Sequence, residues 1–388
     1  MKAHRAAVIG AGHTRFGALP DGPRALLRAA VGGALSSVDR GIDPAAIGAA
    51  YLATLGFGGW QIGNSSAILA EEAGAPGIPC ARIENACASG GFALQAAVSA
   101  IQSGAVDVAL VAGLEKMTDV SSARRRYWLG VSGDTEWERM AGLTFAGVYG
   151  LIASRYLALH HVGPEALAEV AVKNHANGLL NPNAHFQKAI TREAALASPR
   201  VADPLGLYDC CPVSDGASAL LLVRADSARK YTDTPVYIDG IGAASDYLAV
   251  QERSEPTRFE ATRRAGDAAF RSAGCERSEL SFLELHDCFT IAELLALEDL
   301  GFAARGGAAV MTLSGATRRD GSLPVNPDGG LKAKGHPIGA TGVSQAYEVF
   351  VQLRGQAGPR QVPRRERALT HNVGGAGATA AVTVFSVG

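Results

Sequence analysis

Ile83-Glu84-Asn85-Ala86-Cys87-Ala88-Ser89-Gly90-Gly91 is the stretch around which this chain is organised. The apolar segment after it, residues 92–101, has its large side chains at helical spacing, so we predict a helix that begins near Cys87 and ends before Gly104. The unpaired N–H groups and the dipole at a helix start favour a thiolate. We therefore expect the pKa of Cys87 to lie below the ~8.5 of a free thiol. The alternative is a buried structural cysteine.

The composition indicates a globular protein with a large core, since 47% of the 388 residues are hydrophobic and 19% are charged. The net charge of −1 offers no basic surface, so nucleic acid is not expected as a partner. The sequence has no run of about 18 apolar residues, so we expect no membrane-spanning helix. The six cysteines include no Cys-x-x-Cys pair, so neither a metal site nor a disulfide framework is expected. The first residues lead straight into a predicted strand without a signal peptide, and we expect a cytoplasmic protein.

The chain consists of two similar halves. Each begins with a predicted strand, at residues 7–12 and 236–242, and then alternates helices with strands, which is typical of a layered α/β fold. The first half is the longer one, and we place an inserted lid in it at about residues 117–200. The predicted domains are therefore residues 1–230, which include the lid, and residues 231–388.

Three polar segments follow predicted strands of the second half. They are His286-Asp287-Cys288-Phe289-Thr290, Gly335-His336-Pro337-Ile338-Gly339-Ala340-Thr341-Gly342 and His371-Asn372-Val373-Gly374-Gly375. Open α/β sheets bind their ligands at the carboxyl ends of strands. We therefore expect these segments to meet the stretch around Cys87, and this favours a reactive cysteine over a structural one.

These segments together resemble the motifs of the thiolases. Residues 85–90 resemble the thiolase nucleophile motif, and Gly335-His336-Pro337-Ile338-Gly339-Ala340 matches the family's histidine motif residue for residue. Gly113-Leu114-Glu115-Lys116-Met117 resembles the segment that follows the nucleophile. The chain departs from most thiolases at residues 286–289, where they carry an asparagine motif, and at Asn372, where they carry a cysteine. Both departures are similar to the sterol-carrier-protein-type thiolases and their archaeal acetyl-CoA acetyltransferase relatives.

The resemblance implies a thiolase-like fold and a thiolase reaction. The fold would be two similar βαβ-rich halves stacked in five layers, α-β-α-β-α, each half with a mixed five-stranded sheet. The reaction would be the reversible Claisen condensation of acetyl-CoA with an acyl-CoA, or the thiolytic cleavage of a 3-ketoacyl-CoA, through an acyl-cysteine. Coenzyme A and its thioesters would be the substrates, with no tightly bound cofactor.

The resemblance assigns two tasks to cysteines: one cysteine holds the acyl group covalently and the other transfers a proton. Cys87 would be the nucleophile that holds the acyl group. Cys288 would be the acid/base that exchanges the α-proton of the substrate, in place of the cysteine that most thiolases carry at Asn372. The alternative for Cys288 is a small buried residue packed beside Phe289.

The remaining catalytic tasks require hydrogen-bond donors where an oxygen becomes anionic. His286 and His336 would polarise the thioester oxygen of the enolate. The backbone N–H groups of Cys87 and Gly374 would hold the tetrahedral oxyanion, with Asn372 supporting that loop. His336 would also lower the cost of forming the Cys87 thiolate.

The predicted lid supplies candidates for substrate contacts. The bulky side chains that we place in the acyl-binding wall are Trp128, Trp137, Met140, Leu143 and Phe145. The alternative is ordinary lid packing. The run Arg124-Arg125-Arg126 is either a solvated face or a phosphate contact for a nucleotide-bearing substrate. Cys210, Cys211 and His175 are interpreted as structural.

The resemblance also bears on partners and on alternative functions. Thiolase dimers bury the edge strand of the first half, so a homodimer or a tetramer is expected. Similar archaeal thiolases pair with a hydroxymethylglutaryl-CoA synthase and a small zinc-ribbon, CoA-binding protein. Three alternatives stay open: a non-catalytic subunit of such a channelling complex, a decarboxylating ketosynthase in which Cys288 would be spare, and a retro-aldolase. Retro-aldolase relatives replace the cysteine and histidine chemistry with tyrosines.

Overall fold

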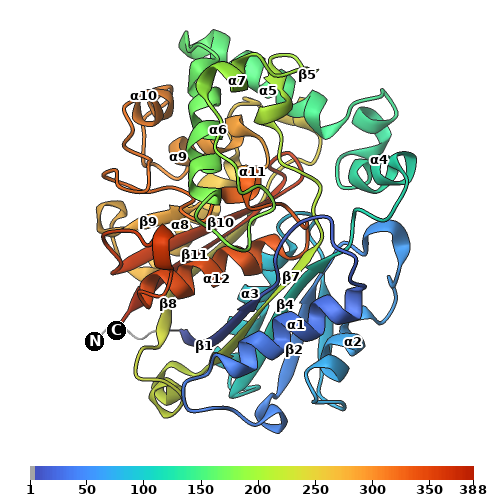
Figure 1. The fold of residues 1–388 in the computed structure, drawn as a ribbon, viewed down its shortest axis with the longest axis vertical. Coiled ribbons are helices and arrows are strands. Elements are labelled where there is room, and N and C mark those ends of the chain that lie inside the picture. The colour runs from blue at the N-terminus through green and yellow to red at the C-terminus, as the bar shows by residue number, and fades with distance from the viewer. Residues whose placement is uncertain (1–4) are drawn as a thin grey trace.

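The computed structural model describes residues 5–388, and the described part is built on a large mixed β-sheet (Figure 1). Its strands are β1 (Ala6–His13), β2 (Ala49–Ala53), β3 (Cys80–Ile83), β4 (Val108–Glu115), β7 (Gly216–Val223), β8 (Val236–Ser245), β9 (Phe282–Glu284), β10 (Arg367–Gly374) and β11 (Thr379–Val387). Their order across the sheet is β3-β2-β4-β7-β1-β8-β11-β10-β9. A separate hairpin pairs β5 (Arg200–Ala202) with β6 (Leu205–Gly206).

The two halves of the chain are hydrogen-bonded edge to edge within this sheet. β1 pairs antiparallel with β8, so that Ala6 lies opposite Ile238. The expectation of a mixed five-stranded sheet in each half is therefore right for the strand count of the first half and wrong for the second, and the strands of both halves form one sheet. The second half contributes four strands within the described residues, and a fifth is reduced to one bridge between Leu283 and Val325. Pro324 precedes Val325 and has no N–H group to extend the ladder.

Helices cover both outer faces of the sheet and fill the space between its two halves (Figure 1). α1 (Pro23–Ser36) and α2 (Ser65–Glu72) pack on the outer face of the first half. α8 (Glu260–Ala273) and α9 (Thr290–Asp299) cover the outer face of the second half. α3 (Ser89–Gln102) and α12 (Thr341–Leu353) lie between the inner faces. The expected five layers, α-β-α-β-α, are confirmed.

The two central helices can be buried because they carry almost no charge. α3 has none, and the Glu348 carboxylate of α12 is paired with Arg360, whose Nε lies 2.9 Å from Glu348 Oε1. The helices also touch at their first turns, where a Cβ on Gly90 would lie 2.8 Å from the backbone of Gly342. The loop before each helix is thereby brought to the same place between the halves.

The lid lies beyond the carboxyl ends of the central strands (Figure 1). Its helices are α4 (Ser122–Gly130), a π-helical turn (Thr135–Arg139), α5 (Phe145–His160), α6 (Glu165–Gly178) and α7 (Arg192–Leu196). α10 (Gly307–Leu313) and α11 (Gly330–Ala333) from the second half pack on α6. Within residues 5–388, no helix combines the length and apolar character that crossing a bilayer requires.

Candidate active site

Cys87 lies in a tight turn between β3 and α3. The turn requires a left-handed backbone at Ala86, with φ of 48°, which is uncommon for a residue with a side chain. The Ser89 hydroxyl stabilises this conformation, since it donates to the Ala86 carbonyl at 2.6 Å and accepts the Asn85 N–H at 2.9 Å. The turn leaves the Cys87 side chain half-buried at the start of the helix.

The structure brings the predicted catalytic residues together. Cys87 Sγ and one ring nitrogen each of His286 and His336 lie within 4.8 Å of one another. The two imidazole rings are 5.2 Å apart and nearly perpendicular. Cys288 is 6% exposed, and a charge on Cys87 would raise its pKa, so the two thiols are near enough to interact electrostatically. Asn372 reaches the same pocket from β10.

The hydrogen bonds of His336 fix which ring nitrogen carries the proton. Burial, with a contribution from Lys334, lowers the pKa of His336 to about 3, so the ring is neutral. Thr341 donates its hydroxyl proton to the Pro337 carbonyl at 2.9 Å and therefore accepts from Nδ1–H of His336 at 2.6 Å. His336 Nε2 is left unprotonated, and it can accept the thiol proton of Cys87.

His286 has the opposite tautomer, and Asn372 determines it. Asn372 Oδ1 accepts the Gly91 N–H at 3.0 Å, and Nδ2 donates to the Cys87 carbonyl at 2.8 Å, so the amide orientation is fixed by two backbone groups. Nδ2 also lies 3.2 Å from His286 Nδ1, which must accept. The proton of His286 is therefore on Nε2, a buried atom for which the described residues supply no partner.

A cysteine and two histidines at this separation are also a typical ligand set for a transition metal. Ligation through Nε2 of His286 would move the ring proton to Nδ1, where it would face the N–H of Asn372 Nδ2. The amide therefore favours a hydrogen-bond donor at His286 Nε2 over a metal ligand. A donor at this point suits a developing oxyanion.

The pKa of Cys87 differs from the expectation drawn from the sequence. Burial, followed by the influence of Cys211, raises it to about 12, while a hydrogen bond from the Gly375 N–H lowers it by less. The prediction of a low pKa is wrong because removing the thiolate from water outweighs the favourable field of the helix start. Cys87 is a thiol at rest, and it needs a proton acceptor when it attacks.

The glycine loop after β10 is packed tightly against the nucleophile turn. A Cβ on Gly374 would lie 2.3 Å from Thr379 Oγ1 and 2.5 Å from the Asn85 carbonyl oxygen, so no larger residue fits. The Cys87 sulfur accepts hydrogen bonds from its own N–H and from that of Gly375, which has φ of 61°. The sequence did not single out Gly375, although the Gly-Gly pair marks the backbone as unusual.

The candidate residues of the acyl-binding wall divide into two groups. Trp128 packs in the same small cluster as Cys87, and Phe145 lies 4.0 Å from where a Cβ of Gly375 would be. In contrast, Trp137 is 63% exposed and Met140 is 80% exposed, so both lie on the outer surface of the lid. Leu143 is half-buried and lines an apolar cavity of about 280 Å³ between α5 and residues 250–256. The structure does not bring Met140 into the pocket.

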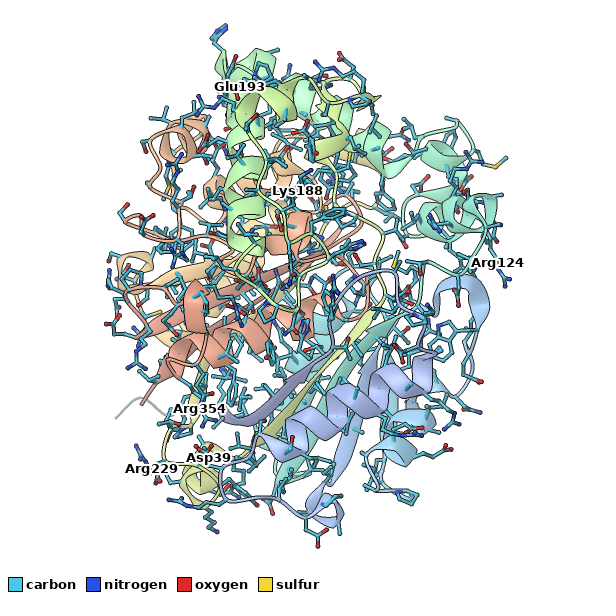
Figure 2. All side chains as sticks on the ribbon, in the orientation of Figure 1. Asp39, Arg124, Lys188, Glu193, Arg229 and Arg354 are labelled. Atoms are coloured by element: carbon cyan, nitrogen blue, oxygen red, sulfur yellow. The ribbon has the colours of Figure 1, made fainter. Side chains whose placement is uncertain are left out.

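The arginine run and the cysteine pair also have separate environments. Arg124 lies at the outer edge of the molecule (Figure 2), and Arg125 donates to the Val120 carbonyl at 3.3 Å. Cys211 is close to the site, because its N–H donates to the Cys288 carbonyl at 3.0 Å. The interpretation of Cys211 as structural did not anticipate this contact, which only the fold creates.

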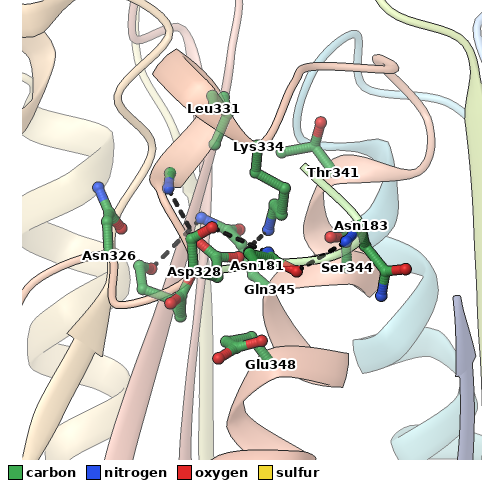
Figure 3. A network of polar contacts seen from close by, with 12 residues as sticks. Asn181, Asn183, Asn326, Asp328, Leu331, Lys334, Thr341, Ser344, Gln345 and Glu348 are labelled. Carbon is green, nitrogen blue, oxygen red and sulfur yellow. Dashed lines mark hydrogen bonds and ion pairs between the residues drawn. The ribbon is translucent and has the colours of Figure 1, made fainter. Parts of the chain in front are cut away.

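A buried ionic network supports the two histidine loops (Figure 3). Lys334, two residues before His336, is paired with Asp328. Asp287, next to His286, accepts the N–H groups of Leu331 at 2.7 Å and of Lys332 at 3.2 Å. Both loops are thus tied to the same segment, residues 328–334, which fixes their relative position.

The chain matches family models over both halves. Residues 6–226 match the model described as "Thiolase, N-terminal domain", and residues 242–387 match "Thiolase C-terminal domain-like". A relative named acetyl-CoA acetyltransferase from Methanothermobacter thermautotrophicus is 45% identical over 382 residues, which are 98% of this chain and 99% of that protein.

Two further relatives place the chain within this family. Sterol carrier protein 2 of Homo sapiens is 33% identical over 327 residues, which cover 81% of this chain and 60% of that protein. The solved structure titled "Ltp2-ChsH2(DUF35) aldolase" is 25% identical with a TM-score of 0.85, covering 100% of this chain and 98% of that one. The chain therefore belongs to the thiolase superfamily.

Proposed function

We propose that this protein is an acyl-CoA acetyltransferase that works through an acyl-cysteine at Cys87. The observation that best supports the proposal is the pair of opposite histidine tautomers beside this thiol. His336 presents a proton acceptor and His286 presents a proton donor, and both are fixed by hydrogen bonds outside the pocket. Cys87 is protonated at rest, so it needs the proton acceptor when it attacks. The oxygen that becomes anionic during the reaction needs the proton donor.

Thiolytic cleavage begins at the nucleophile. Cys87 attacks the 3-keto carbon of the substrate while its proton passes to His336 Nε2, and backbone N–H groups of the Gly374–Gly375 loop hold the new oxyanion. Collapse of this intermediate breaks the C2–C3 bond. The products of the step are an acyl group on Cys87 and the enolate of acetyl-CoA, whose oxygen accepts hydrogen bonds from His286 and from protonated His336.

The second cysteine completes the proton balance. Cys288 gives its thiol proton to C2 of the enolate, which releases acetyl-CoA and leaves a Cys288 thiolate. Coenzyme A then attacks the acyl group on Cys87 and passes its own thiol proton to Cys288, while His336 returns its proton to Cys87. The reverse sequence is the Claisen condensation.

The site supports the thiolase reaction better than the alternatives. A decarboxylating ketosynthase generates its carbanion without removing a proton, and Cys288 would then have no task. An aldolase is the second candidate, because one structural neighbour carries that title. The presence of Cys87, His286, Cys288 and His336 in one pocket favours acyl transfer over aldol cleavage.

The same neighbour suggests an assembly. Its title joins Ltp2 with ChsH2(DUF35), and we propose that this chain also has a DUF35 partner, in the place of the small CoA-binding protein that the resemblance implies. We also propose a homodimer formed through β3, which is a half-exposed strand at the edge of the sheet.

The test is the thiolysis of acetoacetyl-CoA, measured with the chain alone and with candidate partners. Wild-type enzyme should cleave the substrate and carry an acetyl group on the peptide that contains Cys87, detected by mass spectrometry. A retro-aldol substrate supplied in parallel should not be cleaved. Cleavage of that substrate alone, without any acyl-enzyme, would reject the proposal in favour of an aldolase.

A further inference from the structure

Tyr149 is a buried tyrosine of α5 that no sequence motif marks. It is 1% exposed, and its ring is stacked on that of Phe289, with centroids 4.5 Å apart. Phe289 follows Cys288 directly, so this stacking holds the tyrosine beside the acid/base candidate. Tyr149 thus reaches the pocket from the lid, a part of the chain far from every catalytic motif.

The Tyr149 hydroxyl contacts the neighbours of both reactive cysteines. It donates to the Gly375 carbonyl at 3.1 Å, and the N–H of the same glycine hydrogen-bonds the Cys87 sulfur. Burial raises the pKa of Cys288 most, the charge of Cys87 raises it further, and a hydrogen bond with Tyr149 lowers it. The hydroxyl has one proton, so it can donate to only one acceptor at a time, either the Gly375 carbonyl or the Cys288 sulfur.

Neither histidine is placed to serve Cys288 in the same way. The Nδ1 atom of His336 is held by Thr341, and that of His286 is held by Asn372. One ring nitrogen of each histidine lies within 4.8 Å of the Cys87 sulfur. A thiolate at Cys288 has the backbone N–H of Phe289 as one donor, and a second donor stabilises it further because a buried charge is costly.

We infer that Tyr149 is a catalytic residue whose hydroxyl turns from the Gly375 carbonyl to the Cys288 sulfur once Cys288 has lost its proton, and so stabilises the thiolate. The inference rests on the proposed function, in which Cys288 is the acid/base. The proton that leaves Cys288 is transferred to C2 of the enolate, and the phenolic proton stays on Tyr149. When coenzyme A returns a proton to Cys288, the hydroxyl turns back.

The test compares Tyr149→Phe with Tyr156→Phe. Tyr156 is a matched control, since it is equally buried on the same helix and donates to Glu298 Oε1 at 2.6 Å rather than to the site. Both changes keep the ring and remove one buried hydroxyl. Alkylation of Cys288 by iodoacetamide is followed over a range of pH by peptide mass spectrometry, in a Cys87→Ala background that keeps the nucleophile from consuming the reagent.

Loss of a hydrogen bond to a charged group should shift the Cys288 alkylation profile upward by about one to two pH units in Tyr149→Phe. Tyr156→Phe should leave the profile unchanged. In enzyme that retains Cys87, Tyr149→Phe should slow the exchange of acetyl-CoA methyl protons with deuterated water by about 10- to 100-fold. Acylation of Cys87 should stay close to that of the control.

An alkylation profile that is the same in Tyr149→Phe and Tyr156→Phe would overturn the inference. The alkylation experiment needs no turnover, so an upward shift in a protein without thiolase activity would support the Tyr149 contact and reject the proposed function instead. If Tyr149→Phe does not fold, Phe289→Leu serves in its place. It keeps the hydroxyl but removes the stacked ring, and it should shift the profile in the same direction by less.

Discussion

Cys87 and Cys288 occupy matching places in the two halves of the molecule, yet their neighbours differ. Each lies in the turn between a strand and a helix, Cys87 between β3 and α3 and Cys288 between β9 and α9. Burial raises the pKa of both thiols. Position and burial therefore do not distinguish a nucleophile from a proton donor.

The proton acceptors nearby make the distinction. One ring nitrogen of His336 lies within 4.8 Å of Cys87 Sγ, and Thr341 holds the Nδ1–H, so Nε2 is free to take the proton of Cys87 as it attacks. The neighbour of Cys288 is the hydroxyl of Tyr149. Burial raises the pKa of Tyr149 well above its ordinary value, so this hydroxyl can donate a hydrogen bond but does not take a proton. Cys288 should keep its proton until a carbanion removes it.

Replacing the nucleophile should give the largest effect. Cys87→Ala should abolish the acyl-enzyme and lower thiolysis by about 10⁴-fold or more, because within residues 5–388 Cys87 is the thiol grouped with both histidines. Turnover and acyl-enzyme are measured together by a CoA-release assay and mass spectrometry. Cys80→Ala, in the edge strand β3, is the control and should keep near wild-type activity. A Cys87→Ala enzyme with an acyl group on another cysteine would contradict the comparison.

The tautomer of His286 should be the next most sensitive feature. Asn372→Asp keeps the shape of the side chain but places an acceptor opposite His286 Nδ1, which moves the ring proton away from Nε2. Loss of one oxyanion donor costs about 10²- to 10³-fold in kcat, and we expect that range here. Thermal unfolding of the variant controls for a general loss of structure. Wild-type kcat would show that His286 is not the donor.

The protonation state of Cys87 can be read from its reaction with iodoacetamide. A pKa of about 12, raised by burial, means that the reactive thiolate is a small fraction at neutral pH. The alkylation rate should therefore rise about tenfold for each pH unit through the neutral range, without a plateau. A plateau above pH ~7 would restore the low pKa that the helix start alone predicts.

Substitutions in the acyl-binding wall should have the smallest effect on activity. Phe145→Ala should change the ratio of rates on long and short 3-ketoacyl-CoA by about 10-fold, as expected for a change in an apolar pocket wall. Met140→Ala, at an exposed position of the same lid, should leave the ratio unchanged. Equal ratios in both variants would make Phe145 a packing residue.

Much of the fold could be predicted because its decisive signals are local. The uncharged segment after Cys87 predicts a buried helix, and α3 begins at Ser89 as the pattern requires. The glycine motif before α12 likewise marks a second helix start, and the contact of Gly90 with Gly342 explains why both motifs need small residues. The joining of the halves through β1 and β8 depends on a long-range pairing for which no short pattern gives a signal.

The site was less predictable where it depends on burial and on neighbours from other elements. A sequence shows that Cys87 starts a helix, but it does not show how far the thiol is removed from water, which decides its pKa. Tyr149 and Cys211 were missed for the same reason, since each reaches Cys288 only through the fold. Met140 was placed in the pocket because it is bulky and lies in the lid, whereas the lid turns it outward.

The division of labour between the two cysteines is the central claim, and Cys288→Ala tests it most directly. The exchange of acetyl-CoA methyl protons with deuterated water should fall by about 10²- to 10⁴-fold, the usual contribution of a general acid/base. Acylation of Cys87 by acetyl-CoA should fall by less than about tenfold, because the departing coenzyme A thiolate, unlike a carbanion, is stable without the proton that Cys288 would give it. Cys211→Ala, at the neighbouring thiol, is the matched control. Exchange at the wild-type rate in Cys288→Ala would contradict the account, and the base would then have to be sought at the loop of His371 and Asn372.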